Sequence, residues 1–114
     1  MKRVYVAGKL NADAPNYIKN CHAMIKTADA IRREGYSVYV PCLDFLSGLV
    51  YGNYGYKDYF ENNLPWLECA DYMFVCENSE KSEGTKKEIK IAKKLGKKIF
   101  YDLFELAYFN KEAK

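Results

Sequence analysis

The segment from Ser82 to Glu88 is the part of the chain whose residue types and spacing are best suited to chemistry. It reads Ser-Glu-Gly-Thr-Lys-Lys-Glu, so a small hydroxyl residue and Gly84 precede a predicted helix. Backbone amides that open a helix in this way bind anions. Glu88 shares a helix face with Thr85 and Ala92, and we expect its carboxylate to point toward the sheet. An inward carboxylate beside an anion cradle has little structural purpose, although a cap or surface role also fits this loose pattern.

Strands and helices alternate along the chain, and this alternation sets where such a site must lie. The predicted strands are residues 3–7, 37–40, 71–76 and 98–101; the predicted helices run from a cap at Asp13 or Asn16 to Gly35, and over 58–70, 84–95 and 103–109. Residues 42–55 are predicted to be loop, and Pro65 is expected to kink or divide the second helix. The order predicts an α/β fold, a Rossmann-like three-layer domain with a parallel sheet of four to five strands.

The composition indicates a single domain over residues 1–114. Hydrophobic residues make up 49% of the chain and charged residues 29%, which is a globular composition. No apolar run approaches the ~20 residues of a membrane span, and the apolar stretch behind the basic start is too short for a signal peptide. We therefore expect a cytoplasmic protein with reduced cysteines and no membrane contact.

The residue types give little reason to expect a metal site, a cofactor or a nucleic-acid partner. The four cysteines have no C-x-x-C spacing and the chain has one histidine, His22, so no metal site is expected. No organic cofactor is expected either. The net charge of +3 is too mild to predict a nucleic-acid polymer as a partner.

In open parallel sheets, ligands bind beyond the carboxyl ends of the strands. In this chain those ends are residues 8–11, 41–44 and 76–88. The Ser82–Glu88 segment is thus predicted to face Gly8, Lys9 and Asn11 across the end of the sheet.

Three motifs, taken in order, carry a resemblance to a known family. They are Tyr5-Val6-Ala7-Gly8 at the end of the first strand, Ala70-Asp71 before the third, and Ser82-x-Gly84-x-x-x-Glu88 leading into Ala92-x-x-Leu95-Gly96. From residue 3 to residue 101 the chain resembles the nucleoside 2-deoxyribosyltransferase superfamily. Its branch of 2'-deoxynucleoside 5'-phosphate N-hydrolases is the closer match, and a set of small uncharacterised phage and bacterial proteins is similar too.

The resemblance implies a catalytic role for three residues. Glu88 matches the nucleophile, Asp71 matches the aspartate that handles the proton of the departing base, and Tyr5 matches a tyrosine beside the nucleophile. Breaking an N-glycosidic bond passes through an oxocarbenium-like transition state, which a carboxylate stabilises or traps while a second acid protonates the base.

The resemblance also implies the substrate contacts. Ser82 stands where the hydrolases have a serine that touches the 5'-phosphate, which favours a nucleotide over a nucleoside. Gly84 and Thr85 would contribute their amides, and Gly8, Lys9 and Asn11 would complete the set. The hydrolases have a small hydroxyl residue and an arginine where this chain has Lys9 and Asn11, and the tyrosine-rich residues 43–59 have no counterpart.

The function predicted from these residues is N-glycosidic bond cleavage or transfer on (2'-deoxy)nucleoside 5'-monophosphates through a glutamate nucleophile. Relatives are dimers or larger, so a homodimer or larger homo-oligomer is expected. One alternative is a non-catalytic nucleotide-binding sensor or inhibitor module that keeps the pocket. Another is an enzyme like the cytokinin-activating phosphoribohydrolases, of whose P-G-G-x-G-T-x-x-E run only Gly84-Thr85-x-x-Glu88 is present.

Overall fold

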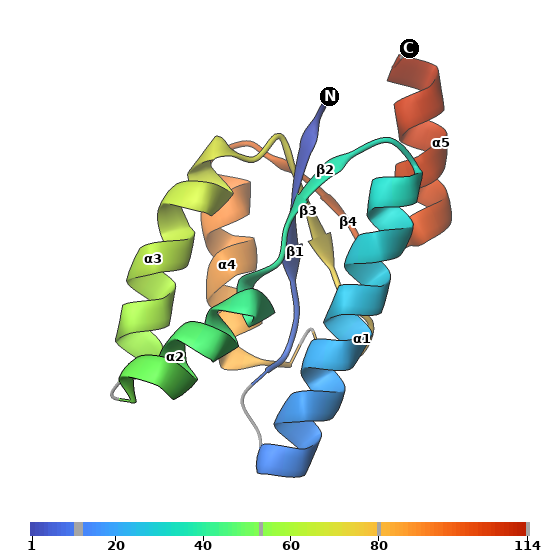
Figure 1. Ribbon diagram of the computed structural model, residues 1–114. Helices are drawn as coiled ribbons and strands as arrows, with labels where there is room; N and C mark the ends of the chain where they lie inside the picture. Colours follow the sequence, from blue (N-terminus) through green and yellow to red (C-terminus); the bar gives the residue numbers. More distant parts are fainter. Residues whose placement is uncertain (11–12, 53, 80, 114) are drawn as a thin grey trace.

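A parallel sheet between two layers of helices forms the centre of the computed structural model, which describes residues 1–10, 13–52, 54–79 and 81–113 (Figure 1). The strands are β1 (Arg3–Ala7), β2 (Ser37–Tyr39), β3 (Tyr72–Val75) and β4 (Lys98–Phe100). The helices are α1 (Ala14–Arg33), α2 (Phe45–Tyr51), α3 (Tyr56–Cys69), α4 (Glu83–Lys94) and α5 (Leu103–Ala113), and a 3-10 turn, η1, covers Pro41–Asp44.

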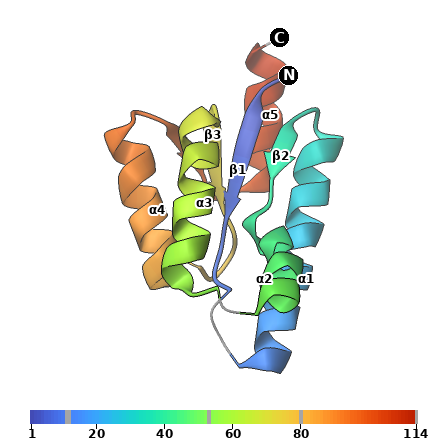
Figure 2. The same ribbon diagram turned by 60° about the vertical axis from the view of Figure 1, so that its left-hand side comes forward.

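The four strands lie in the order β2-β1-β3-β4, and each neighbouring pair is parallel. Tyr5 in β1 stands opposite Tyr39 in β2 and Met73 in β3. Helices α3 and α4 cover one face of the sheet, and α1 and α5 cover the other (Figure 2). The predicted α/β, Rossmann-like three-layer class is therefore confirmed, with four strands.

Alternation along β1 divides the core into two clusters. Val4 and Val6 face α1 and α5, where they pack with Met24 and Ile31. The other cluster lies under α3 and α4 and contains Tyr5, Ala7, Leu67, Met73, Val75 and Ala92. Because both faces are covered, the inner strands are apolar on both sides, as parallel sheets require.

Residues 42–55 were predicted to be loop, and the structure shows that this prediction is wrong over most of the segment. Here η1 leads into α2, a helix of 7 residues that ends at Gly52. Gly52 has a φ of +84° and donates its amide to the carbonyl of Gly48, which closes the last turn. A left-handed residue at this position favours glycine, and a helix of two turns is too short to show a clear period in sequence.

Pro65 lies inside α3, which continues through it as one helix from Tyr56 to Cys69. The prediction that Pro65 divides the helix is therefore wrong. Proline removes the donor that would bond the carbonyl of Glu61, four residues earlier. Both residues are exposed, so water can satisfy that carbonyl.

Within the described ranges, no helix has the length and apolarity to cross a membrane.

Candidate functional site

Glu88 and Tyr5 meet between the sheet and α4. The Tyr5 side chain projects from the middle of β1 and is fully buried. Its hydroxyl donates a hydrogen bond to Oε2 of Glu88, which lies in the second turn of α4 and is partly buried. Two of the three predicted catalytic residues are therefore in direct contact, on the side of the sheet that α3 and α4 cover.

Burial controls the protonation of this pair. It raises the pKa of the Glu88 carboxyl to about 7, although the hydrogen bond from Tyr5 opposes the rise. The pKa of Tyr5 is raised first by burial and then by the negative charge of Glu88, so its hydroxyl stays protonated and remains a donor at neutral pH. A carboxyl that titrates near neutral pH beside a fixed donor is typical of catalytic sites.

The first turn of α4 has the form predicted for an anion cradle. Ser82 is the N-cap, and its Oγ accepts a hydrogen bond from the Thr85 amide over 3.4 Å. A Cβ on Gly84 would lie 3.3 Å from the ring of Tyr56, so glycine allows this ring to pack against the helix. Thr85 is fully buried, and its hydroxyl has no partner among the described residues. Ser82, Gly84 and Thr85 thus lie together, within two turns of Glu88.

The end of β1 contacts the loop that follows β3. The Lys9 amide donates to Oγ of Ser79 over 2.9 Å, and Ser79 is buried. A Cβ on Gly8 would lie 2.9 Å from Cε of Met24 and 3.1 Å from Cβ of Cys76, so a larger residue here would require the end of the Met24 side chain to move. Gly8 and Lys9 are therefore at the carboxyl edge, as predicted, and the predicted contact Asn11 lies outside the described residues.

Asp71 does not join Glu88. It precedes β3 at the amino edge of the sheet, where its Oδ2 accepts a hydrogen bond from the Arg3 amide over 2.8 Å. Its own amide donates to the Arg3 carbonyl over 2.9 Å. The carboxylate is exposed, at the opposite edge from Ser82 and Gly84. The predicted pairing of Asp71 with the nucleophile is not observed, because the residue fastens β3 to the start of β1.

Tyr39, Asn63 and Trp66 belong to the surroundings of Tyr5, and none was predicted. The Tyr39 ring stacks on Tyr5 with centroids 5.6 Å apart, and Trp66 stacks on Tyr39 at 5.2 Å. The Tyr39 hydroxyl donates to Oδ1 of Asn63 over 2.8 Å, and Asn63 is buried in α3. An amide four residues before the buried Leu67, on the apolar face of a predicted helix, was the available signal.

The tyrosine-rich segment reaches the site through Tyr56, the first residue of α3. Its ring lies against Gly84, as noted above, and Nζ of Lys87 stands 5.1 Å from the ring centroid. Burial and then the charge of Glu88 raise the pKa of the Tyr56 hydroxyl. The start of α3 therefore forms one wall beside the α4 N-terminus, and Figure 1 shows α2 and the starts of α3 and α4 gathered at the carboxyl end of β1.

A cavity of about 280 Å³ lies beside this wall, between α2 and α3. It is lined by Asp44, Ser47, Tyr54, Asp58, Tyr59 and Asn62. The negative charge of Asp44 contributes to the raised pKa values of Tyr5 and Tyr39. This carboxylate therefore acts electrostatically on Tyr5, the residue that bonds Glu88. In the described part of the chain, no group of three or more His, Cys, Asp or Glu residues has the arrangement of a metal site.

The fold and site define a Rossmann-like α/β domain with a shielded carboxylate on the α3–α4 face, beside a helix N-terminus at the carboxyl edge. The chain belongs to the family described as a domain of unknown function (DUF4406), which it matches over residues 2–101. Searches of curated proteins and of solved structures gave no significant match. The family description names no activity, so activity must be argued from the site.

Proposed function

We propose that the protein cleaves or transfers the N-glycosidic bond of (2'-deoxy)nucleoside 5'-monophosphates, with Glu88 as the nucleophile. The observation that carries the proposal is the partly buried contact between Glu88 and the Tyr5 hydroxyl, within two turns of the Ser82 cap. A carboxylate placed there is oriented, sheltered from water and close to amides that can bind a phosphate. The resemblance to the deoxyribosyltransferase superfamily supports the same reading and implies a homo-oligomer.

In the proposed reaction, the Glu88 carboxylate attacks C1' of the sugar as the base departs. The C1'–N bond breaks with its electron pair going to the base, which takes up a proton, and an ester bond forms between Glu88 and C1'. Water, or a second base, then attacks C1' and releases the carboxylate. Tyr5 holds Oε2, which leaves Oε1 of Glu88 for the attack.

The proton for the departing base needs a source other than Asp71, which lies at the far edge of the sheet in contact with Arg3. General acid catalysis requires a group within reach of the reacting bond, so this proton must come from the carboxyl edge of the sheet, from water or from a residue that lines the substrate site.

The proposal is tested by incubating the protein with a panel of nucleoside and 2'-deoxynucleoside 5'-monophosphates and following free base by chromatography. Glu88→Ala is expected to lower base release by about 10³-fold or more, because removal of a nucleophile has effects of this size. Glu88→Gln should lose turnover and keep nucleotide affinity. Glu105→Gln, an exposed residue on α5 at the opposite face of the sheet, is the matched control and should retain full activity.

Activity of Glu88→Ala within tenfold of the wild type would remove Glu88 from the mechanism. Nucleotide binding by both the wild type and Glu88→Gln, with no base released from any monophosphate, would instead favour the non-catalytic sensor. Calorimetric titration alongside the chromatographic assay therefore separates the two functions.

A further inference from the structure

The cavity between α2 and α3 has no role in the reaction described so far. Its volume of about 280 Å³ is at the lower end of the range for small-molecule sites, which suits a single planar group better than a large ligand. It is formed by the tyrosine-rich segment that the sequence left without a function. Its position beside the proposed nucleophile makes it a candidate subsite.

The first turn of α3 lies between the cavity and the site. Tyr56 in this turn packs on Gly84 at the start of α4, whereas Asp58, two residues later and on the other side of the helix, lines the cavity. From the other wall, Asp44 acts on the Tyr5 hydroxyl that bonds Glu88. In the pose that we consider, the phosphate lies at α4, the sugar lies at Glu88, and the base extends past the start of α3 toward Asp44 and the cavity.

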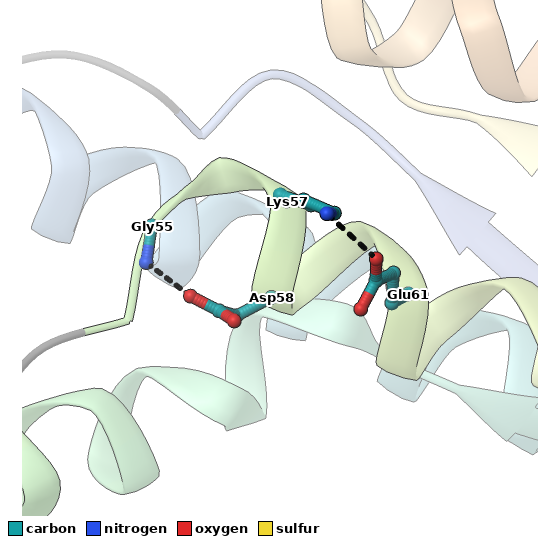
Figure 3. A network of polar contacts seen from close by, with 4 residues as sticks. All are labelled: Gly55, Lys57, Asp58 and Glu61. Atoms are coloured by element: carbon teal, nitrogen blue, oxygen red, sulfur yellow. Dashed lines mark hydrogen bonds and ion pairs between the residues drawn. The ribbon is translucent and has the colours of Figure 1, made fainter.

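The polar lining is acidic. Asp58 accepts a hydrogen bond from the Gly55 amide over 2.8 Å (Figure 3). Asp44 accepts one from Nδ2 of Asn62 over 3.2 Å. In each pair the bond is to Oδ2, so among the described residues Oδ1 of each aspartate remains as an acceptor. The six lining residues include two carboxylates and no cationic side chain. The lining thus offers acceptors to a ligand that brings hydrogen-bond donors.

Aromatic rings complete the cavity wall. Tyr54 and Tyr59 meet edge to face, with centroids 5.6 Å apart and planes at 81°. Rings held in this way present a face on which a planar heterocycle can stack. The Tyr59 hydroxyl is held against α2, since a Cβ on Gly48 would lie only 1.9 Å from its oxygen.

We infer that this cavity holds the nucleobase of the substrate and selects bases with an exocyclic amino group, as in adenine and cytosine, over their oxo counterparts. The inference rests on the proposed function for the identity of the ligand as a nucleotide. An amino group donates to the Asp44 carboxylate, whereas a carbonyl oxygen in the same place would be repelled by its negative charge.

The test compares matched nucleotides that differ in this group and in the proton on the adjacent ring nitrogen: dAMP against dIMP, and dCMP against dUMP. Affinities are measured by calorimetry for the wild type, Asp44→Asn and the control Glu61→Gln. Glu61 lies in α3 and pairs with Lys57 at 3.7 Å, outside the cavity lining (Figure 3). We expect the amino member of each pair to bind at least about tenfold tighter in the wild type and in Glu61→Gln, and the ratio to fall toward one in Asp44→Asn.

A second pair of variants tests the cavity without changing its charge. Gly48→Ala should displace Tyr59 and weaken binding of all four nucleotides, because the new Cβ would collide with the Tyr59 hydroxyl. Adding Tyr59→Phe removes the colliding oxygen and should restore most of the affinity. A Gly48→Ala protein that binds as well as the wild type would overturn the inference.

The outcomes separate this inference from the proposed function. Equal affinities within both pairs, with base release intact, would overturn base selection and leave the reaction standing. An amino preference that depends on Asp44, with no base released, would overturn the reaction and leave the cavity assignment standing. Failure of every nucleotide to bind would overturn both.

Discussion

At the scale of single residues, Glu88 and Tyr5 depend on each other. Burial favours the neutral carboxylic acid, and the Tyr5 hydroxyl favours the carboxylate, which gives Glu88 a pKa of about 7. A nucleophile must be ionised, so in the proposed reaction the rate should rise with pH through this value. Tyr5 then acts as a positioning residue that increases the reactive fraction of Glu88 at neutral pH.

Tyr5→Phe should move that rising limb to higher pH. The variant removes the hydrogen bond that lowers the pKa of Glu88 and leaves burial, the opposing influence, unchanged. Base release should fall several-fold at pH 7 and recover toward the wild-type rate at higher pH. The measurement is kcat/KM against pH for both proteins, because this ratio reports groups of the free enzyme.

An unshifted limb in Tyr5→Phe would contradict the assigned role of Tyr5, whatever the loss in rate. Tyr39→Phe is the matched control. It removes a hydroxyl from the ring that stacks on Tyr5, but that hydroxyl bonds Asn63 and not Glu88. It should lower stability and leave the limb in place.

Sequence reasoning found Tyr5, Ser82, Gly84 and Glu88 because each lies in a motif with fixed spacing along one strand or one helix start. Tyr39 and Asn63 were not predicted from the sequence. Their contact joins β2 to α3, and such a contact depends on how a helix lies over a sheet, which local spacing does not encode.

At the scale of elements, the α4 N-terminus is where helix formation and proposed substrate binding use the same groups. The Ser82 hydroxyl caps the helix through the Thr85 amide, and an incoming phosphate would contact the same turn. The α1 N-terminus provides a comparison, because its cap is Asp13, whose Oδ1 accepts from the Asn16 amide over 3.0 Å. A carboxylate at that cap repels anions.

Ser82→Ala should cost about 1 kcal/mol of stability and lower affinity for nucleoside monophosphates by about tenfold. Asp13→Ala should cost a similar amount of stability and leave affinity unchanged. Urea denaturation and calorimetric titration measure the two quantities for each variant. Nucleosides without a phosphate should bind Ser82→Ala and the wild type equally; if they bind the wild type as tightly as the monophosphates do, α4 is not a phosphate site.

The four strands and the longer helices were predicted from the sequence, and the short helix α2 was not. Predicted and observed strands agree within a residue or two, since short β-rich runs end at glycine, proline or polar residues. The helix α2 was missed because seven residues give too little periodicity. Pro65 was predicted to kink or divide a helix that in fact continues through it. The effect of such a proline depends on whether solvent reaches the carbonyl that it leaves without a donor, here that of Glu61.

At the scale of the whole molecule, strand order determines which predicted residues meet. The resemblance to the deoxyribosyltransferase superfamily implied that Asp71 and Glu88 act together. Parallel strands put the start of β3 at one edge of the sheet and the start of α4 at the other, so Asp71 bonds Arg3 instead. The same topology brings the carboxyl end of β2, with Asp44, to the edge where α4 begins.

The burial of Glu88 should also make the free energy of unfolding of the whole molecule depend on pH. Its pKa is about 7 in the folded protein against an ordinary value of 4.5, so the folded state holds a proton that the unfolded state has lost between these values. The stabilisation from this proton is complete below pH 4.5 and is lost as pH rises through about 7. By pH 8, ionised Glu88 therefore costs the fold up to about 3 kcal/mol.

Glu88→Gln removes this cost, because its neutral amide has nearly the same shape and its oxygen can still accept the Tyr5 hydrogen bond. At pH 8 the variant should be more stable than the wild type by up to about 3 kcal/mol, and at pH 4.5 the two should be nearly equal. Urea denaturation at the two pH values measures the difference, with Glu105→Gln on α5 as the exposed control that changes neither. An identical stability difference at both pH values would show that Glu88 titrates as an ordinary glutamate. A variant that gains stability at pH 8 and loses base release would instead show that the charge of Glu88 serves the reaction at the expense of the fold.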